Sequence, residues 1–228
     1  MERFNTCGAA GHAVIVCGID EAGRGSFVGP LVIAGVAVDE SKLSILEEAG
    51  VRDSKALTPR ARTRLCRTIL ENATDHVVRR IRPRTIDNSV VFHGLSDLEL
   101  DRMAGIVSEM HADAYYVDSC YADATLFGER IANLSGNSNI RSHTKADSRF
   151  TVVAAASILA KVARDRSVSN IRRTHPVGSG YPSDPRAAEC VGRIYRATGS
   201  FPDFARRSWY TACRIAGEQR VRTGTPGQ

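Results

Sequence analysis

Two neighbouring carboxylates, Asp20 and Glu21, stand at the end of the apolar run of residues 13–19. The chain then passes at once through residues 22–25, in which two glycines flank an arginine. Adjacent acids would be a poor choice for a core, because buried carboxylates are costly unless they are paired or coordinate a metal. The arrangement favours a site that holds cations against a phosphate chain.

Two more acids stand at comparable positions. Asp118 ends a predicted strand over residues 114–117, and Asp147 leads into a long alanine-rich helix predicted over residues 152–171. Sites in layered α/β folds form where strands end, so we expect the four acids to converge. Four carboxylates in one place repel one another unless cations neutralise them, and Mg²⁺ prefers carboxylate and water oxygens. Two such ions about 3.5–4 Å apart would support in-line displacement at phosphorus.

The elements that must position these acids indicate an α/β layer fold. A glycine turn joins the first two apolar runs as a hairpin, and later strands alternate with helices, which predicts a mixed five-stranded sheet flanked by helices. Thr58 with Pro59, and later Ser96, are residue types that begin helices. Strands are expected over residues 13–19, 31–38, 76–81, 114–117 and 139–143, and helices over residues 42–48, 58–72, 97–110, 121–134 and 152–171.

We expect one catalytic unit with an appendage. A chain of 228 residues can bury one substantial core. Residues 1–12 are expected to form a flexible polar leader and residues 13–175 the catalytic domain. Residues 176–228 are expected to form a C-terminal loop and helical extension packed on the same unit.

Charge is distributed unevenly along the chain. From residue 141 onwards there are 16 Lys and Arg against 6 Asp and Glu, a net charge of +10, whereas residues 1–140 carry 15 against 19, a net charge of −4. The acidic part is suited to cations and the basic part to a polyanion. A solvated basic helix face would give the same excess, so charge alone does not decide between the two interpretations.

Several classes of protein are disfavoured. No apolar run approaches the roughly 20 residues of a membrane span, and the first residues lack the apolar core of a signal peptide, so we expect a cytoplasmic protein. The six cysteines show no Cys-x-x-Cys spacing and the six histidines no paired metal spacing. The chain has no P-loop sequence, so nucleotide hydrolysis is not supported.

Five ordered motifs together resemble the type 2 ribonucleases H, the ribonuclease HII family, in its archaeal and eukaryotic branch. The resemblance spans roughly residues 13–215. The matching segments are Ile19-Asp-Glu-Ala-Gly-Arg-Gly25 with Gly29-Pro30, Asp53-Ser54-Lys55, Tyr116-Val-Asp118, Lys145-Ala-Asp147 with residues 155–165, and Gly178-Ser-Gly-Tyr181-Pro-Ser-Asp-Pro185. Two stretches depart from the family pattern: Ser26-Phe27 replaces a step that usually contains proline, and residues 87–95 lack the expected asparagine-leucine character.

The resemblance implies a ribonuclease H-like fold and a metal-dependent endoribonuclease. Such an enzyme would cleave RNA in RNA/DNA hybrids and would cut 5′ of single ribonucleotides embedded in duplex DNA, leaving 5′-phosphate and 3′-hydroxyl ends. The catalytic and metal-binding residues would be Asp20, Glu21, Asp118 and Asp147, which would hold two Mg²⁺ or Mn²⁺ ions around the scissile phosphate.

The resemblance also implies how the substrate is recognised. Gly23, Arg24 and Gly25 would read the 2′-hydroxyl, which is both a donor and an acceptor, and Tyr181 would pack against the sugar of the following nucleotide. Lys55 and Lys145 would contact phosphates. We expect a monomer, and the last residues lack the apolar and aromatic pattern of a sliding-clamp tail, so that partner is not predicted.

Simpler interpretations exist for single residues. Asp118 alone also fits a solvated strand end, and Tyr181 a buried loop tyrosine. The cations Arg24, Lys55 and Lys145 would equally fit surface groups paired with a neighbour such as Asp53 or Asp147. Lys161 and Arg164 are interpreted mainly as structural, and the sequence does not assign Ser157 between phosphate contact and packing.

Two other functions share part of the pattern. A non-catalytic module that binds hybrids would share the basic region and the glycine turn but would not need four acids. A DNA-processing nuclease or recombinase of the same broad fold would share the acids but would have no reason for the Gly-Arg-Gly turn or Tyr181.

Overall fold

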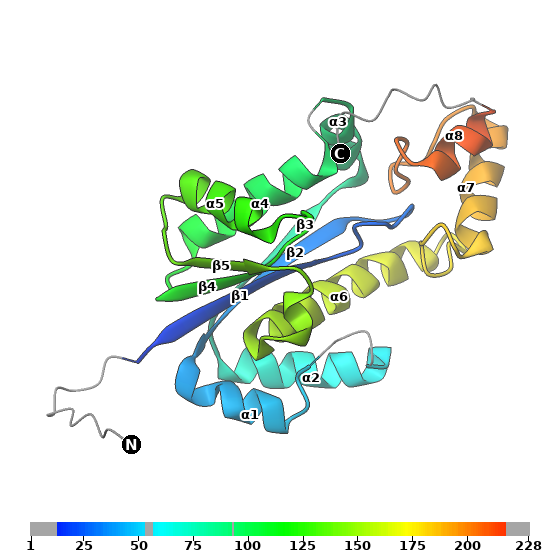
Figure 1. The fold of residues 1–228 in the computed structure, drawn as a ribbon. Coiled ribbons are helices and arrows are strands. Elements are labelled where there is room, and N and C mark those ends of the chain that lie inside the picture. The colour runs from blue at the N-terminus through cyan, green and yellow to red at the C-terminus, as the bar shows by residue number, and fades with distance from the viewer. Residues whose placement is uncertain (1–12, 53–56, 93, 218–228) are drawn as a thin grey trace, which may run out of the picture.

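A mixed five-stranded sheet forms the centre of the molecule (Figure 1). The computed structural model describes residues 13–52, 57–92 and 94–217. The order across the sheet is β3-β2-β1-β4-β5, in which β1 and β2 form the predicted antiparallel hairpin and β1 runs parallel to β4. The strands are β1 (Ile15–Ala22), β2 (Leu31–Asp39), β3 (Ala73–Ile81), β4 (Ala114–Asp118) and β5 (Ile140–His143). The predicted sheet is therefore confirmed.

Helices cover both faces of this sheet, with α1, α2 and α6 on one face and α3, α4 and α5 on the other (Figure 1). In the described residues, no helix is long and apolar enough to cross a bilayer. The helices are α1 (Leu43–Glu48), α2 (Pro59–Asn72), α3 (Pro83–Phe92), α4 (Leu95–Glu109), α5 (Ala124–Ser135), α6 (Thr151–Arg172), α7 (Pro185–Thr198) and α8 (Tyr210–Ala216), with short 3-10 helices η1 (Glu40–Lys42) and η3 (Ala146–Ser148).

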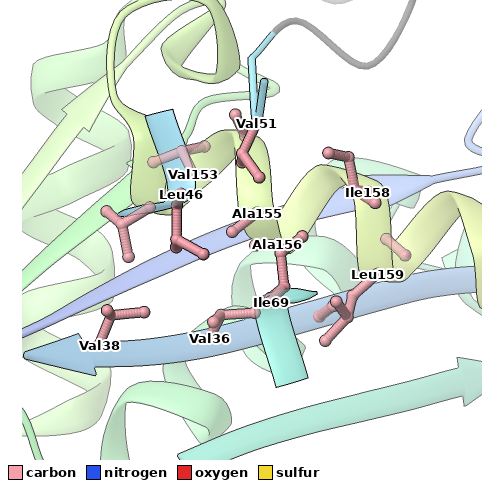
Figure 2. Packing of buried hydrophobic residues seen from close by; sticks show 14 of the residues in the cluster. Val36, Val38, Leu46, Val51, Ile69, Val153, Ala155, Ala156, Ile158 and Leu159 are labelled. Atoms are coloured by element: carbon pink, nitrogen blue, oxygen red, sulfur yellow. The ribbon is translucent and has the colours of Figure 1, made fainter. Parts of the chain in front are cut away.

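Helix α6 packs closely on the sheet because its first half is rich in small residues. Residues 152–160 of α6 are all buried, and four of them are alanine. Figure 2 shows Ala155, Ala156 and Ile158 of this helix among valines of β2 and apolar side chains of α1 and α2. The close approach of α6 fixes its position relative to the end of β1, where the acids lie.

A third apolar cluster joins the C-terminal extension to the rest of the molecule. Phe27 and Val28, which connect β1 to β2, and Val168 of α6 are buried with apolar residues of α7 and α8. Phe27 belongs to one of the two stretches where the sequence departs from the family pattern, and its side chain is fully buried here. The extension therefore packs directly on the glycine turn.

Some element boundaries differ from the sequence prediction. Helix α3 is not among the predicted helices, because Pro83 and Ile86 are its only buried positions and give a weak apolar stripe. Helix α4 begins at Leu95, with Gly94 at its N-cap, because the hydroxyl of Ser96 accepts a hydrogen bond from Arg24 instead of capping the helix. Strand β3 follows α2 directly, three residues earlier than expected.

Helix α5, in contrast, begins later than the predicted residue 121. Its N-cap is Asp123, whose side chain accepts a hydrogen bond from the amide of Leu126. Thr58 caps α2 as predicted, with its hydroxyl accepting from the amide of Ala61 at 3.2 Å. Local capping chemistry is thus a sound guide where the capping side chain has no distant partner.

The contact between β1 and α6 gives a test of this packing. A Cβ atom on Gly18 would lie 2.2 Å from the carbonyl oxygen of Val152, which is backbone and has little freedom to move. We expect Gly18→Ala to lower the free energy of unfolding by about 3 kcal/mol, measured by urea denaturation. Gly25→Ala is the matched control, because nothing lies within 4 Å of its added Cβ; equal losses for both variants would contradict the packing described.

Candidate active site

The acids at the end of β1 meet an acid from the neighbouring strand. The parallel register pairs Ile19 of β1 with Val117 of β4, so the next residue of each strand is a carboxylate, Asp20 and Asp118. Together with Glu21 they form a cluster in which one carboxylate oxygen from each residue lies within 4.8 Å of the others. Asp20 is buried and only 4% exposed.

Glu21 reaches this cluster from the opposite face of the strand. Successive strand residues point to opposite sides of a sheet, and Asp20 accordingly bonds to the hydroxyl of Ser157 on α6, whereas Glu21 faces the charge of Glu99 on α4. The amide of Glu21 donates to Asp20 Oδ1 at 2.6 Å. The cluster therefore has polar neighbours on helices of both layers.

Asp147 lies beside the cluster without being one of its three close members. Asp118 Oδ1 accepts a hydrogen bond of 2.6 Å from the amide of Ala146, which ties η3 to the end of β4. The following residue, Asp147, is only 5% exposed, and its negative charge contributes to the raised pKa of Asp20. The four acids singled out in the sequence thus share one neighbourhood.

The electrostatics of the cluster are unfavourable without a cation. Burial raises the pKa of Asp20 to about 7, and the charge of Asp118 adds to the shift. Burial, followed by the charge of Asp20, also holds the pKa of Glu21 well above its ordinary value. Glu21 Oε2 is buried and has no hydrogen-bond partner in the described part of the chain. An all-carboxylate set with an unsatisfied buried oxygen fits a hard divalent cation, which takes oxygen ligands.

Ser157 and Lys161 extend this site along α6. The ammonium of Lys161 donates to Ser157 Oγ at 3.1 Å, and Ser157 in turn bonds to Asp20. The two residues are four apart, so they share a helix face. The sequence does not assign Ser157 and indicates a mainly structural Lys161. In the structure Lys161 contacts Ser157, which contacts Asp20, so both residues belong to the site.

The glycine turn is held by a buried arginine that the sequence does not indicate. Arg206 is fully buried, and its guanidinium donates to the carbonyls of Gly23, Arg24 and Gly29 at 2.6, 2.7 and 3.2 Å. Burial, together with the nearby charge of Arg164, lowers the pKa of Arg206 to about 10. The positive φ of Gly23, 84°, is a conformation that favours glycine. No local sequence signal marks Arg206, because its partners lie in the distant turn.

Arg24 itself is directed towards α4. Its Nε donates to Glu99 Oε2 at 2.9 Å and its Nη2 to Ser96 Oγ at 2.9 Å. Glu99 is fully buried, and burial raises its pKa despite the opposing effect of Arg24. The structure therefore pairs Arg24 with an acid that the sequence does not suggest, although 42% of the Arg24 side chain stays exposed.

Tyr181 lies on the loop that closes over the glycine turn. The amides of Phe27 and Val28 both donate to the carbonyl of Gly180 at 2.9 Å. The guanidinium carbon of Arg164 lies 4.3 Å from the centre of the Tyr181 ring, and Arg164 also donates to Ser26 Oγ at 2.8 Å. Ser26, which departs from the family pattern together with Phe27, thereby gains a polar partner. Arg164 is structural, as predicted, but it also supports Tyr181.

Of the two predicted phosphate contacts, the structure describes Lys145 but not Lys55. Lys145 is exposed beside Asp147 and is the only residue other than glycine, among those described, with a positive φ, 55°. Lys55 lies outside the described residues, as does Asp53.

Comparison with known proteins agrees with this geometry. The family model for ribonuclease HII matches residues 17–212. The ribonuclease HII of Cenarchaeum symbiosum is 49% identical over 199 residues, which cover 87% of this chain and 97% of the relative. The ribonuclease H2 structure from Pyrococcus horikoshii OT3 superimposes with a TM-score of 0.84 at 36% identity, covering 90% of this chain and 98% of the other.

A second solved relative is ribonuclease HII of Archaeoglobus fulgidus in a complex with PCNA, with a TM-score of 0.80, 31% identity, and coverage of 90% of this chain and 98% of the relative. The fold and the acidic cluster are those of a nuclease of the ribonuclease H type. The chain belongs to the ribonuclease HII family. It is thus an endoribonuclease of a family whose members depend on divalent metals.

The raised pKa of Asp20 predicts an unusual pH dependence. Because the folded-state value of about 7 exceeds the ordinary 3.8, the metal-free folded protein binds more protons than the unfolded chain between these values. The contribution of Asp20 to stability is therefore lost as pH rises towards 7. In EDTA, urea denaturation should show Asp20→Asn gaining about 1 kcal/mol or more relative to wild type between pH 5 and pH 8. Parallel pH profiles for the two proteins would refute this.

The buried guanidinium of Arg206 gives a stability prediction. Arg206→Gln removes the guanidinium that donates to three carbonyls, which a shorter amide cannot reach together, and we expect a loss of about 3 kcal/mol in the free energy of unfolding. The adjacent Arg207 is the control, because 58% of its side chain is exposed, so Arg207→Gln should change stability by less than about 0.5 kcal/mol. The comparison is made by chemical denaturation of both variants at one pH. Similar losses would show that the bonds from Arg206 to the turn do not stabilise the fold.

Proposed function

We propose that this protein hydrolyses RNA in RNA/DNA hybrids and cuts on the 5′ side of single ribonucleotides embedded in duplex DNA, leaving 5′-phosphate and 3′-hydroxyl ends. The observation that carries the proposal is the convergence of Asp20, Glu21 and Asp118, with Asp147 beside them. A module that only binds hybrids would have no use for this costly arrangement of buried charge.

In this proposal Asp20, Glu21, Asp118 and Asp147 hold two divalent ions, Mg²⁺ or Mn²⁺. When bound, the ions would supply activation of the attacking water and stabilisation of the departing 3′ oxygen. The carboxylates contribute by binding in their charged forms, although burial disfavours those forms in Asp20 and Glu21. Ser157 orients Asp20 through its hydroxyl, and Lys161 positions Ser157.

We assign recognition of the 2′-hydroxyl to the turn over Gly23, Arg24 and Gly25. The carbonyls of Gly23 and Arg24 already accept from Arg206, so the turn is preorganised before substrate arrives. A Cβ at Gly25 would meet nothing within 4 Å, which leaves room for a sugar. A DNA-only nuclease of similar fold would have no reason for a turn held so rigidly.

Tyr181 is assigned to the sugar of the nucleotide that follows the ribonucleotide. The guanidinium of Arg164 lies against one face of the Tyr181 ring and orients that ring. Lys145 and Lys55 are proposed as phosphate contacts. Residues 13–175 would then carry the chemistry, and the extension beyond them would contribute Tyr181 and support the turn through Arg206.

The experiment that tests the proposal uses three matched duplexes: all DNA, DNA with one ribonucleotide, and an RNA/DNA hybrid. We expect metal-dependent cleavage of the second and third only, with the cut in the second on the 5′ side of the ribonucleotide. Asp118→Asn keeps the shape but removes the charge, and should lower the cleavage rate by roughly 10²-fold or more. Asp101→Asn is the control, because 67% of the Asp101 side chain is exposed on α4.

Three results would count against the proposal. Binding without cleavage would favour a binding module, and equal cleavage of the all-DNA duplex would favour a DNA nuclease. Near-normal cleavage by Asp118→Asn would show that the acidic cluster does not take part in the chemistry.

A further inference from the structure

A groove runs between α2 and α6, away from the acidic cluster. Its volume is about 740 Å³. Each helix contributes one wall of the groove. The residues that matter for what it holds are Arg67, Leu70, Val162, Arg166 and Arg172.

The exposed walls of this groove are basic. Arg67, Arg166 and Arg172 are all exposed, and none of the three forms an ion pair within the described part of the chain. The acids of the groove are Glu71 and Asp165. Asp165 accepts from Arg62 at 3.0 Å and from Arg164 at 3.1 Å, so its charge is already compensated. Glu71 forms no ion pair in the described residues, so the four arginines of the lining, Arg62 included, outnumber its two acids and the groove is net positive.

The floor of the groove is apolar. Leu70 is 41% exposed, and Val162 is partly buried beside it. Arginines above apolar side chains suit a chain that alternates phosphates with sugars, because guanidinium groups bind phosphate oxygens while the sugars contact the floor.

A smaller cavity adjoins the groove on the side of the proposed recognition site. This second cavity, of about 380 Å³, is lined by Ala22, Lys161 and Tyr181 among other residues. The two cavities share Pro59, Arg62, Asp165 and Arg172 as lining residues. The groove and the cavity beside Tyr181 are therefore neighbours on one side of the molecule, along which a bound nucleic acid would extend.

We propose that the groove between α2 and α6 binds the phosphodiester backbone of duplex DNA that flanks the cut, through Arg67, Arg166 and Arg172. This inference rests on the proposed function and extends its substrate site. Along α6, the stretch from Lys161 to Arg172 spans about 16 Å, which corresponds to about five base pairs of duplex. The groove binds phosphates and sugars, so it adds affinity that is independent of base sequence and of the ribonucleotide.

The first test measures binding in EDTA, where cleavage does not interfere. The triple variant Arg67→Ala, Arg166→Ala, Arg172→Ala should bind a duplex with one ribonucleotide at least about tenfold more weakly at 0.1 M salt. The slope of log affinity against log salt should fall by about 2 to 3, because each phosphate that is no longer neutralised contributes about 0.9. Replacing the same three residues with lysine should restore most of the slope.

The matched control removes equal charge elsewhere. Arg80, Arg82 and Arg84 are exposed and lie in or beside β3 and α3, away from the groove. Their triple alanine variant should change the slope by less than about 1. Equal effects of the two triple variants would show only a response to net charge and would overturn the assignment of the groove.

The second test locates the bound segment on the substrate. Shortening one of the two duplex arms to about four base pairs should weaken binding by wild type but not by the groove variant, because the variant already lacks the arginines that bind this arm. In cleavage, the groove variant should raise KM and leave kcat unchanged, because the three arginines lie away from the reacting atoms. If neither arm shows this difference between wild type and variant, or if kcat falls while KM stays constant, the groove does not bind substrate.

The two proposals fail separately. Absence of cleavage by wild type would sink the proposed function, whereas the binding measurements in EDTA would still report on the groove. Conversely, normal cleavage with an unchanged salt slope in the groove variant would agree with the proposed active site and contradict the proposed role of the groove.

Discussion

Repulsion among buried carboxylates is the constraint on which the rest of this structure depends. Asp20 and Glu21 lose solvation and face Asp118 within a few ångströms, so both favour their neutral forms in the absence of a cation. A sheet end can hold such a cluster only if the backbone around it is rigid. Glycine at position 18 lets α6 pack directly against β1, and the bond from Ala146 to Asp118 fixes the segment that carries Asp147.

A second set of buried charges supports the turn beside the cluster. Arg206 fills the turn with donors for three carbonyls, while Glu99 holds the side chain of Arg24 from α4. An unpaired charge at either position would be costly in this environment. Arg206 thus compensates backbone carbonyls and Arg24 one buried acid near the turn, whereas Arg67, Arg166 and Arg172 face solvent in the groove.

Local sequence patterns predict the sheet and the four acids, because each apolar run and the acid beside it are neighbours in the chain. Asp20 and Asp118 each follow an apolar strand, and the alternation of strands and helices defines the layers. Ser96 has the character of a helix cap but bonds instead to Arg24, 72 residues away. Arg206 is separated from Gly23 by 183 residues and Glu99 from Arg24 by 75. No period or motif links residues so distant, so these pairings become visible only in the fold.

The distance along the chain between Arg206 and the turn has a consequence for folding. Contacts between residues far apart in sequence bear a loop-closure cost before they stabilise the fold, and the partners here are 177 to 183 residues apart. The three carbonyls of the turn lack these donors until the segment that carries Arg206 docks and Phe27 is covered. An ordered turn beside the acids therefore requires that α7 and α8 have packed against the sheet domain.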